Sequence, residues 1–461
     1  MSKRLTPSDA MFLYGETRET MMHVGGLLLF ATPPDADPDH LRHLMDEVRG
    51  GLPVQPPWSY KLRHPDWLSH PLQAWDESEV DLEYHVRRTA LPSPGDEREL
   101  GIVVSRLHGN ALDMHRPPWE VHLIEGLNDG RFALYVKVHH ALVDGYSAMR
   151  VLVHALSKDA EERDRPLFFS VPPPGRKPRE PQPDEHDHES GGLHWTELAA
   201  AVRAQYGATK TVVRALRNVV RDEELVTPRQ APRCILNGRI SRSRRFATQT
   251  VALDRVKAIA KATGGTLNDV ILALSATSLR RYLLEQNALP DDPLIAMLPV
   301  AIRPKGDAGG GNAVGSILAS LATDIEDPAK QLASIIHSTT RAKHQLQGMS
   351  RIEILSYSAL MLAPAVLNMI PGIAGHMKPT FNIVISNVPG PNDHLYFRGA
   401  QLQCSYPLSI PVHGQALNIT CSSYAGQIGF GFTGCRDTVP HLQRLAVYCG
   451  DAIDELERAV A

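Results

Sequence analysis

Apolar and polar residues alternate, or recur at helical spacing, in several separate stretches of this 461-residue chain. Alternation is typical of a half-buried strand, and recurrence every three to four residues is typical of an amphipathic helix. In the first half the pattern predicts strands at 26–30 and 131–138 and helices at 41–48 and 148–156. In the second half it predicts strands at 248–253, 381–386 and 427–433 and a helix at 270–284. Both halves mix the two elements, so we expect an α/β (α+β) fold.

A stretch rich in proline and charge separates the two halves. Residues 163–192 have the composition of extended, weakly packed chain, and helical spacing resumes at 195–221. We therefore expect an N-terminal half at 1–162, a linker with a connecting helix at 163–228, and a C-terminal half at 229–461. Ligand sites are frequent at domain interfaces, so a channel between the halves is the expected place for a site.

The most apolar stretch is 354–375, which has 22 residues and no charge. Its length would permit a membrane span, but Pro364, Asn368, Pro371 and Gly372 interrupt it. We expect a buried or interfacial segment, which could line a lipid-binding channel or touch a membrane surface. An ordinary core helix fits the same pattern.

Charge and cysteine content exclude several classes of function. The 48 Lys and Arg residues nearly balance 51 Asp and Glu residues, which gives no global case for nucleic acid as a partner. Five cysteines without a CxxC pair indicate neither a disulfide framework nor a zinc knuckle. The N-terminal residues contain no uninterrupted apolar run of the kind that a secretory signal needs, so we expect a cytoplasmic protein. The basic segment 203–245 could bind coenzyme A phosphates or an anionic membrane, or could be a solvated helix face.

The chemistry-bearing feature is RFALYVKVHHALVDG at 131–145. Alternation along the strand places His140 on the apolar face and His139 on the other face, with Tyr135 and Lys137. An imidazole has a pKa of about 6.5 and suits general-base catalysis near neutral pH. A structural histidine packed in the core is the plain alternative. A metal site is disfavoured because adjacent strand residues point to opposite faces.

The acidic and glycine residues after the histidines have several possible roles. Asp144 could orient the imidazole, cap the helix that begins near Ser147, or pair with a distant arginine. Gly145 directly after it is typical of a turn that needs a positive φ. Neither a phosphate-binding glycine loop nor a GxSxG nucleophile elbow is present in the sequence, which disfavours nucleotide hydrolysis and serine hydrolase chemistry.

A second candidate pair is Asn268 and Asp269. The sequence Thr266-Leu-Asn-Asp269 fits a capping box at the start of a helix, which makes Asp269 a structural residue. Asn268 is then free to donate a hydrogen bond to a reacting carbonyl, or simply to tie two segments together.

HHALVDG matches the HHxxxDG signature of acyltransferases that resemble chloramphenicol acetyltransferase. The rest of the chain resembles the bacterial wax ester synthase/diacylglycerol acyltransferase family. The resemblance is carried, in order along the chain, by LTPSDAMFLYGET (5–17), MHVGG (22–26), LDMHRPPWEVHLIEGL (112–127), LNGRISRSRR (236–245), GTLNDVILA (265–273), LPVAIRP (298–304), GNAVGS (311–316) and SNVPGP (386–391). One departure is Pro118, which stands where the family has leucine in its PLW triplet.

The resemblance implies two chloramphenicol-acetyltransferase-like domains with mixed sheets, flanking helices and an active-site channel between them. It implies that His140 is the general base, that His139 belongs to the motif, and that Asp144 makes a structural ion pair with Arg303. It also implies acyl transfer from acyl-CoA, as a substrate and without a bound cofactor or metal, to a fatty alcohol and to diacylglycerol. We expect contact with the inner membrane face or lipid inclusions. The alternatives are a condensation-type enzyme that takes acyl groups from a carrier protein, and a lipid-binding protein without catalysis.

Overall fold

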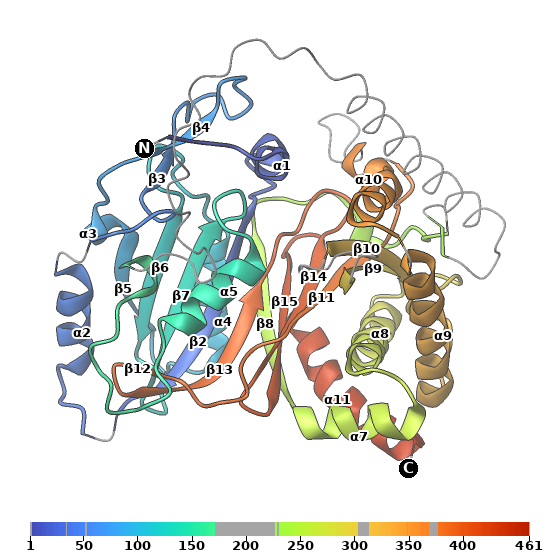
Figure 1. Cartoon of the computed structure of the whole chain (residues 1–461). Coiled ribbons are helices and arrows are strands. Elements are labelled where there is room, and N and C mark those ends of the chain that lie inside the picture. The colour runs from blue at the N-terminus through green and yellow to red at the C-terminus, as the bar shows by residue number, and fades with distance from the viewer. Residues whose placement is uncertain are drawn as a thin grey trace, which may run out of the picture.

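The fold is described from a computed structural model, which covers residues 2–33, 35–50, 53–170, 226–227, 230–302, 313–347, 349–367 and 377–460. The helix predicted at 195–221 and Arg303 lie outside the described residues, as does most of the predicted linker. The described part of the chain forms two large mixed sheets with helices packed against them (Figure 1). The predicted mixture of helices and strands in each half is confirmed.

The first large sheet carries the histidine motif. Its strand order is β12 (Tyr396–Phe397), β13 (Ala400–Leu408), β2 (His23–Ala31), β7 (Arg131–His139), β6 (Trp119–Glu125) and β5 (Val86–Ala90). Only the β5–β6 pair is parallel. Side chains of α2 (His40–Arg49) and α5 (Gly145–His154) form a core with one face, and α4 (Glu97–His108) packs on the other. The strand β7 is flanked by strands on both sides, and most of its residues are buried.

A smaller sheet flanks the first one. It has the order β1 (Ser2–Arg4), β4 (Ala74–Glu77) and β3 (Tyr60–Leu62). The short helices α1 (Pro7–Gly15) and α3 (Leu82–His85) belong to the same half. Helix α1 follows β1 directly and lies at the upper end of the molecule in Figure 1.

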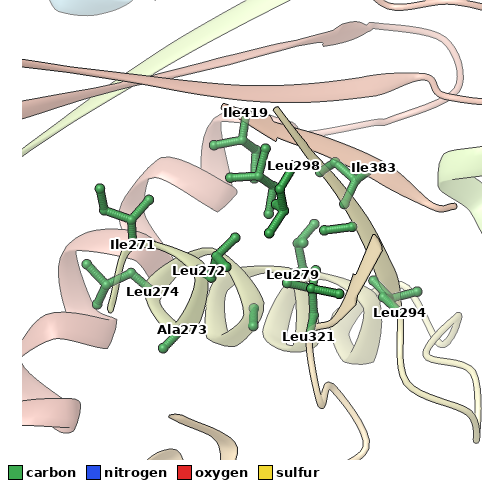
Figure 2. Packing of buried hydrophobic residues seen from close by; sticks show 14 of the residues in the cluster. Ile271, Leu272, Ala273, Leu274, Leu279, Leu294, Leu298, Leu321, Ile383 and Ile419 are labelled. Carbon is green, nitrogen blue, oxygen red and sulfur yellow. The ribbon is translucent and has the colours of Figure 1, made fainter. Parts of the chain in front are cut away.

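The second large sheet has the order β10 (Ala313–Ser320), β9 (Ile295–Ile302), β11 (Ile383–Val388), β14 (Leu417–Tyr424), β15 (Gln427–Cys435) and β8 (Arg244–Ala252). Its helices are α7 (Leu253–Thr263), α8 (Leu267–Glu285), α9 (Pro328–Leu346), α10 (Arg351–Leu367) and α11 (Gln443–Val460). Figure 2 shows Leu272 and Leu279 of α8 directed toward Leu298, Ile383 and Ile419 of the sheet. Because α8 is apolar around most of its circumference, it is the central helix of this core.

The second half contributes two strands to the sheet of the first half. We assigned 229–461 to a single half, whereas β12 and β13 of that range complete the sheet of the first half by pairing β13 with β2. At the same place β13 crosses β15 closely: a Cβ at Gly431 would lie 1.9 Å from the Pro407 carbonyl oxygen, so only glycine fits. Hydrophobic periodicity predicts a strand but not the sheet that it joins, because its partners are distant in sequence.

The apolar stretch at 354–375 is helical over its first part. Helix α10 runs through Pro364 to Leu367, and residues 368–376 lie outside the described residues. Among the described helices, none combines the length and apolarity that a membrane span requires.

Candidate active site

The strand β7 presents two chemically different faces, as alternation along the sequence predicted. Phe132, Val136 and Val138 belong to the core on the α2 and α5 side, whereas Ala133 and Tyr135 pack on the α4 side. The strand ends at His139, and His140 begins the turn into α5. The two adjacent histidines therefore lie at the end of a central strand, one as its last residue and the other in the turn that follows.

His139 is buried, and its contacts are structural. Its Nδ1 accepts a hydrogen bond from the Ala141 N–H at 3.1 Å, which closes the turn. The backbone N–H of His139 donates a hydrogen bond to the Pro118 carbonyl at 2.9 Å. Its Nε2 lies 3.5 Å from Oε2 of Glu16 at the end of α1, without hydrogen-bond geometry. The proline that departs from the family triplet thus contributes a carbonyl to the histidine motif.

His140 is held by its backbone and by one aromatic contact. The backbone N–H of His140 donates a hydrogen bond to the Met22 carbonyl at 2.8 Å. The Phe12 ring stacks on the imidazole with 3.9 Å between ring centroids and 24° between planes. Nδ1 is buried without a hydrogen-bond partner, which leaves Nε2 as the nitrogen available to a substrate. Burial lowers the pKa of His140 below its usual value, although the charge of Asp144 acts in the opposite direction. At neutral pH His140 is therefore a neutral base.

Asp144 is the N-cap of α5. Its two carboxylate oxygens accept hydrogen bonds from the Ser147 backbone N–H at 2.9 Å and from Ser147 Oγ at 2.8 Å. Of the three roles considered, the structure shows the cap; the proposed partner Arg303 lies outside the described residues. Both oxygens are engaged with Ser147, so Asp144 acts on His140 through its charge.

Gly145 differs from the prediction. It is the first residue of α5 and is not among the glycines with positive φ, so the expected left-handed turn is wrong. The reason is that Asp144 takes the cap conformation and the helix starts at once. A Cβ at Gly145 would meet no atom within 4 Å, so this end of α5 borders open space.

A buried polar network fills the opposite face of β7. The Lys137 ammonium donates to the Leu107 and Asn110 carbonyls at 3.2 and 3.0 Å, at the end of α4. It also pairs with Glu120 at 3.1 Å, and Glu120 lies 3.4 Å from His122 Nε2. Burial alone would raise the pKa of Glu120, but His122, Lys137 and Arg87 together lower it to about 2. The Glu120–Lys137 pair is therefore charged inside the fold.

Two further histidines extend this network. His108 Nδ1 lies 2.8 Å from the Tyr135 hydroxyl, its Nε2 lies 3.1 Å from the Ser409 carbonyl, and its own carbonyl lies 2.9 Å from His23 Nε2. Burial lowers the pKa of His108 to about 3 and that of His23 well below its usual value. We did not predict this network, although a lysine in an otherwise apolar strand was a signal. The described residues contain no group of three His, Cys, Asp or Glu side chains placed to hold a metal.

Asn268 and Asp269 lie at the start of α8 in the other half. The predicted capping box is present: Asp269 Oδ2 accepts from the Thr266 N–H at 2.8 Å, and Asp269 Oδ1 accepts from Thr339 Oγ1 at 2.7 Å. The Asn268 side chain accepts a hydrogen bond from the Asn387 amide at 2.8 Å. This contact ties the TLND segment to the SNVPGP turn. It leaves the Asn268 amide N–H groups as donors on an exposed residue.

A cavity lies beside α5. It has a volume of about 540 Å³ and lies between the second half of α5, the segment after it, and the turn at 388–391. Arg150, His154, Lys158 and Arg165 contribute basic groups to its wall, and Asp159 and Glu162 contribute acids. The cavity joins residues of both halves, as expected for a site between domains.

The chain matches two family models. Residues 5–271 match the wax ester synthase/diacylglycerol acyltransferase catalytic domain, and residues 310–457 match the WS/DGAT C-terminal domain. A Mycobacterium tuberculosis protein named for diacylglycerol O-acyltransferase activity is 50% identical, over 99% of this chain and 98% of its own length. The O-acyltransferase WSD of Acinetobacter baylyi is 40% identical, over 99% of this chain and 97% of its own.

Two solved structures are similar to the structure of this chain. The wax ester synthase/diacylglycerol acyltransferase from Marinobacter aquaeolei VT8 is 39% identical with a TM-score of 0.77, covering 99% of this chain and all of that one. The first condensation domain of the calcium-dependent antibiotic synthetase has a TM-score of 0.58 at 17% identity, over 100% of this chain and 97% of its own, and shares the fold.

Proposed function

The chain belongs to the wax ester synthase/diacylglycerol acyltransferase family and is an O-acyltransferase, and from this premise we propose its substrates and mechanism. It transfers a long-chain acyl group from acyl-CoA to a fatty alcohol, giving a wax ester, and to diacylglycerol, giving triacylglycerol. His140 is the general base. The observation that supports this role most directly is a neutral, oriented imidazole at a strand end with one nitrogen buried and the other available.

The proposed reaction needs no covalent acyl-enzyme. His140 Nε2 takes the proton of the acceptor hydroxyl as its oxygen attacks the thioester carbonyl. The tetrahedral intermediate collapses with cleavage of the C–S bond, and the departing CoA thiolate takes the proton back from His140. General-base catalysis of this kind contributes about 10²–10⁴-fold. The Asn268 amide is our candidate donor to the oxyanion, because its oxygen is already held by Asn387.

The cavity beside α5 suits the phosphate-bearing end of acyl-CoA. Its wall carries Arg150, Lys158 and Arg165. Lys158 pairs with Asp393 and Arg165 pairs with Glu162. The Lys158–Asp393 pair is largely solvent-accessible, and an exposed pair of this kind contributes little stability, whereas the Arg165–Glu162 pair is half-buried. A phosphate can replace such partners at small cost. The start of α5 follows the histidine motif, so the helix leads from the proposed base to this cavity.

Binding of the nucleotide part of acyl-CoA in this cavity can be tested by comparing acyl-CoA with an acyl donor that lacks the nucleotide. With palmitoyl-CoA, Lys158→Glu should raise KM about tenfold, the value of one charge-assisted contact. With palmitoyl-pantetheine, which lacks the nucleotide, the same variant should behave as wild type. Lys261→Glu on α7 is the matched control and should change neither KM. Equal effects on both donors would contradict the assignment.

Contact with a lipid surface is proposed for α10, because both acceptors are insoluble. Leu355 and Leu360 of this helix expose 49% of their surface each. Two exposed leucines on one apolar helix favour shallow insertion at an interface. Leu360→Ser should lower the fraction of protein that sediments with liposomes containing diacylglycerol. An unchanged bound fraction would contradict this contact.

The reaction itself is tested by thiol release from palmitoyl-CoA, with hexadecanol, with diacylglycerol or without acceptor. Release that depends on an acceptor establishes acyl transfer and ranks the acceptors. Equal release without acceptor would show a thioesterase. If no thiol is released under any of the three conditions, free acyl-CoA is not the donor, and an acyl group bound to a carrier protein is favoured.

A further inference from the structure

The structure leaves open which residue orients the His140 imidazole. In many sites a carboxylate or carbonyl holds the second nitrogen of the base. Here Nδ1 has no hydrogen-bond partner in another described residue, and both oxygens of Asp144 are engaged with Ser147. A hydrogen bond of His140 to its own backbone acts on the ring and raises its pKa. Among contacts from other described residues, the one on the face of the ring is the stacked side chain of Phe12.

Helix α1 is built to hold Phe12 in place. A capping box between Thr6 and Asp9 fixes its start, and Leu13 anchors it with 1% of its surface exposed. Tyr14, one position further, points outward with 56% exposed. Phe12 itself is half-buried at the edge of the core of the first half, so its ring lies between that core and the His140 imidazole.

The same helix also reaches the first histidine. Glu16, the C-cap residue four positions after Phe12, lies 3.5 Å from His139 Nε2 and accepts a hydrogen bond from the Met22 N–H. The Met22 carbonyl in turn accepts the His140 N–H. Phe12 and Glu16 are one helical turn apart, so one face of α1 contacts both histidines of the motif.

We infer that Phe12 is a positioning residue for catalysis: its ring fixes the plane of the His140 imidazole and stabilises the imidazolium that forms during acyl transfer. This inference rests on the proposed role of His140. A stacked aromatic face limits rotation about the last side-chain bond, so Nε2 keeps one direction. It also attracts the positive charge that appears on the imidazole when the hydroxyl proton arrives.

A substitution that keeps apolar bulk but removes the aromatic face isolates this effect. Phe12→Leu should lower kcat about 5–30-fold, the value of a partly desolvated cation–π contact, with KM for palmitoyl-CoA unchanged. Phe12→Tyr keeps the face and should retain near wild-type kcat. The matched control is Tyr14→Leu, the same aromatic loss at an exposed position of the same helix, which should have wild-type kcat.

The pH dependence separates positioning from damage. The charged or titratable groups that act on His140 are Asp144, His139 and, from α1, Asp9. Phe12→Leu leaves them in place but removes a partner of the protonated ring, so the acid limb of kcat should move to lower pH. A loosened site that admits water would move this limb upward toward 6.5, because burial is what depresses the pKa of His140.

The closing experiment combines kinetics with NMR titration of ¹³C-histidine-labelled protein, in which the His140 signal is identified by its loss in His140→Gln. A lower His140 pKa together with lower kcat in Phe12→Leu is the expected result. Wild-type kcat, an upward shift, or an equal loss in Tyr14→Leu would overturn the inference. If His140→Gln keeps wild-type turnover, the proposed base is wrong, and the titration still reports whether Phe12 acts on the imidazole.

Discussion

Histidines lie on both sides of the first large sheet, and they differ in how completely their nitrogens are bonded. On the α4 side, both nitrogens of His108 have partners, and His23 contacts the His108 carbonyl. On the α5 side, His140 has a buried Nδ1 without a hydrogen bond to another described residue, and an aromatic ring lies against its face. Buried polar groups are bonded in nearly all proteins, so an unbonded one calls for an explanation.

The difference distinguishes a structural role from a chemical one. A histidine with both nitrogens engaged cannot take a proton from a substrate without breaking the fold's own bonds. His140 can, because Nε2 is uncommitted and the ring is held by stacking. The bonded face keeps β7 rigid, and the other face uses that rigidity to hold the proposed base.

The largest effect on stability is expected in the bonded network. Glu120→Gln leaves the Lys137 ammonium buried without its carboxylate, which should reduce the free energy of unfolding by about 3–5 kcal/mol. Urea unfolding at pH 7.5 measures it. Glu125→Gln on the same strand breaks the more exposed pair with Arg88 and should reduce it by less than about 1 kcal/mol. Similar losses in the two variants would contradict the claim that burial of the Glu120–Lys137 pair makes this network structural.

An intermediate effect is expected from acidification. The pKa of His108 is about 3 when folded and about 6.5 when unfolded, so only the unfolded chain gains a proton as pH falls below 6.5. The contribution of His108 to stability is complete above pH 6.5 and is lost progressively toward pH 3. At pH 5 the loss is about 2 kcal/mol, and His23 adds to it in the same direction.

Urea unfolding of wild type at pH 7.5 and 5.0 measures this dependence. His108→Gln should flatten it, whereas His43→Gln, at an exposed position, should leave it unchanged. An equal dependence on pH in wild type and His108→Gln would show that the buried histidine is not its source.

The smallest effect is expected at Asp144. Asp144→Ala removes the cap of α5 and should cost about 1 kcal/mol of stability, whereas Asp144→Asn keeps an acceptor for the Ser147 N–H and should cost less. Loss of its charge should move the acid limb of kcat to lower pH, because this charge raises the pKa of His140. A loss of kcat near 10⁴-fold, as when the orienting carboxylate of a catalytic triad is removed, would show instead that Asp144 orients the imidazole.

Sequence reasoning predicted the strand that carries the histidine motif, because alternation on a strand is a local property, and the strand ends at His139. It also identified the capping box at Thr266 and Asp269, where all the interacting groups lie within one turn. It was wrong at Gly145, because Asp-Gly is typical of turns but Asp144 here caps a helix. Proposed catalytic roles for Asn268 and His140 remain predictions.

The contacts of Phe12 and Glu16 could not be predicted in the same way. Both lie in a segment that carries the family resemblance, yet more than 120 residues separate them from the histidines they contact, and no local pattern records such a contact. The addition of β13 to the first sheet is unpredictable for the same reason, because strand partners depend on the whole fold.

The central claim is that His140, and not its neighbour, is the base. The most direct measurement is acceptor-dependent thiol release from palmitoyl-CoA by His140→Gln and by His139→Asn, which keeps an acceptor near the position of Nδ1. The account predicts that His140→Gln loses about 10²–10⁴-fold in kcat while remaining folded. It predicts that His139→Asn loses stability but retains most of its turnover per folded molecule. Wild-type turnover in folded His140→Gln would contradict it.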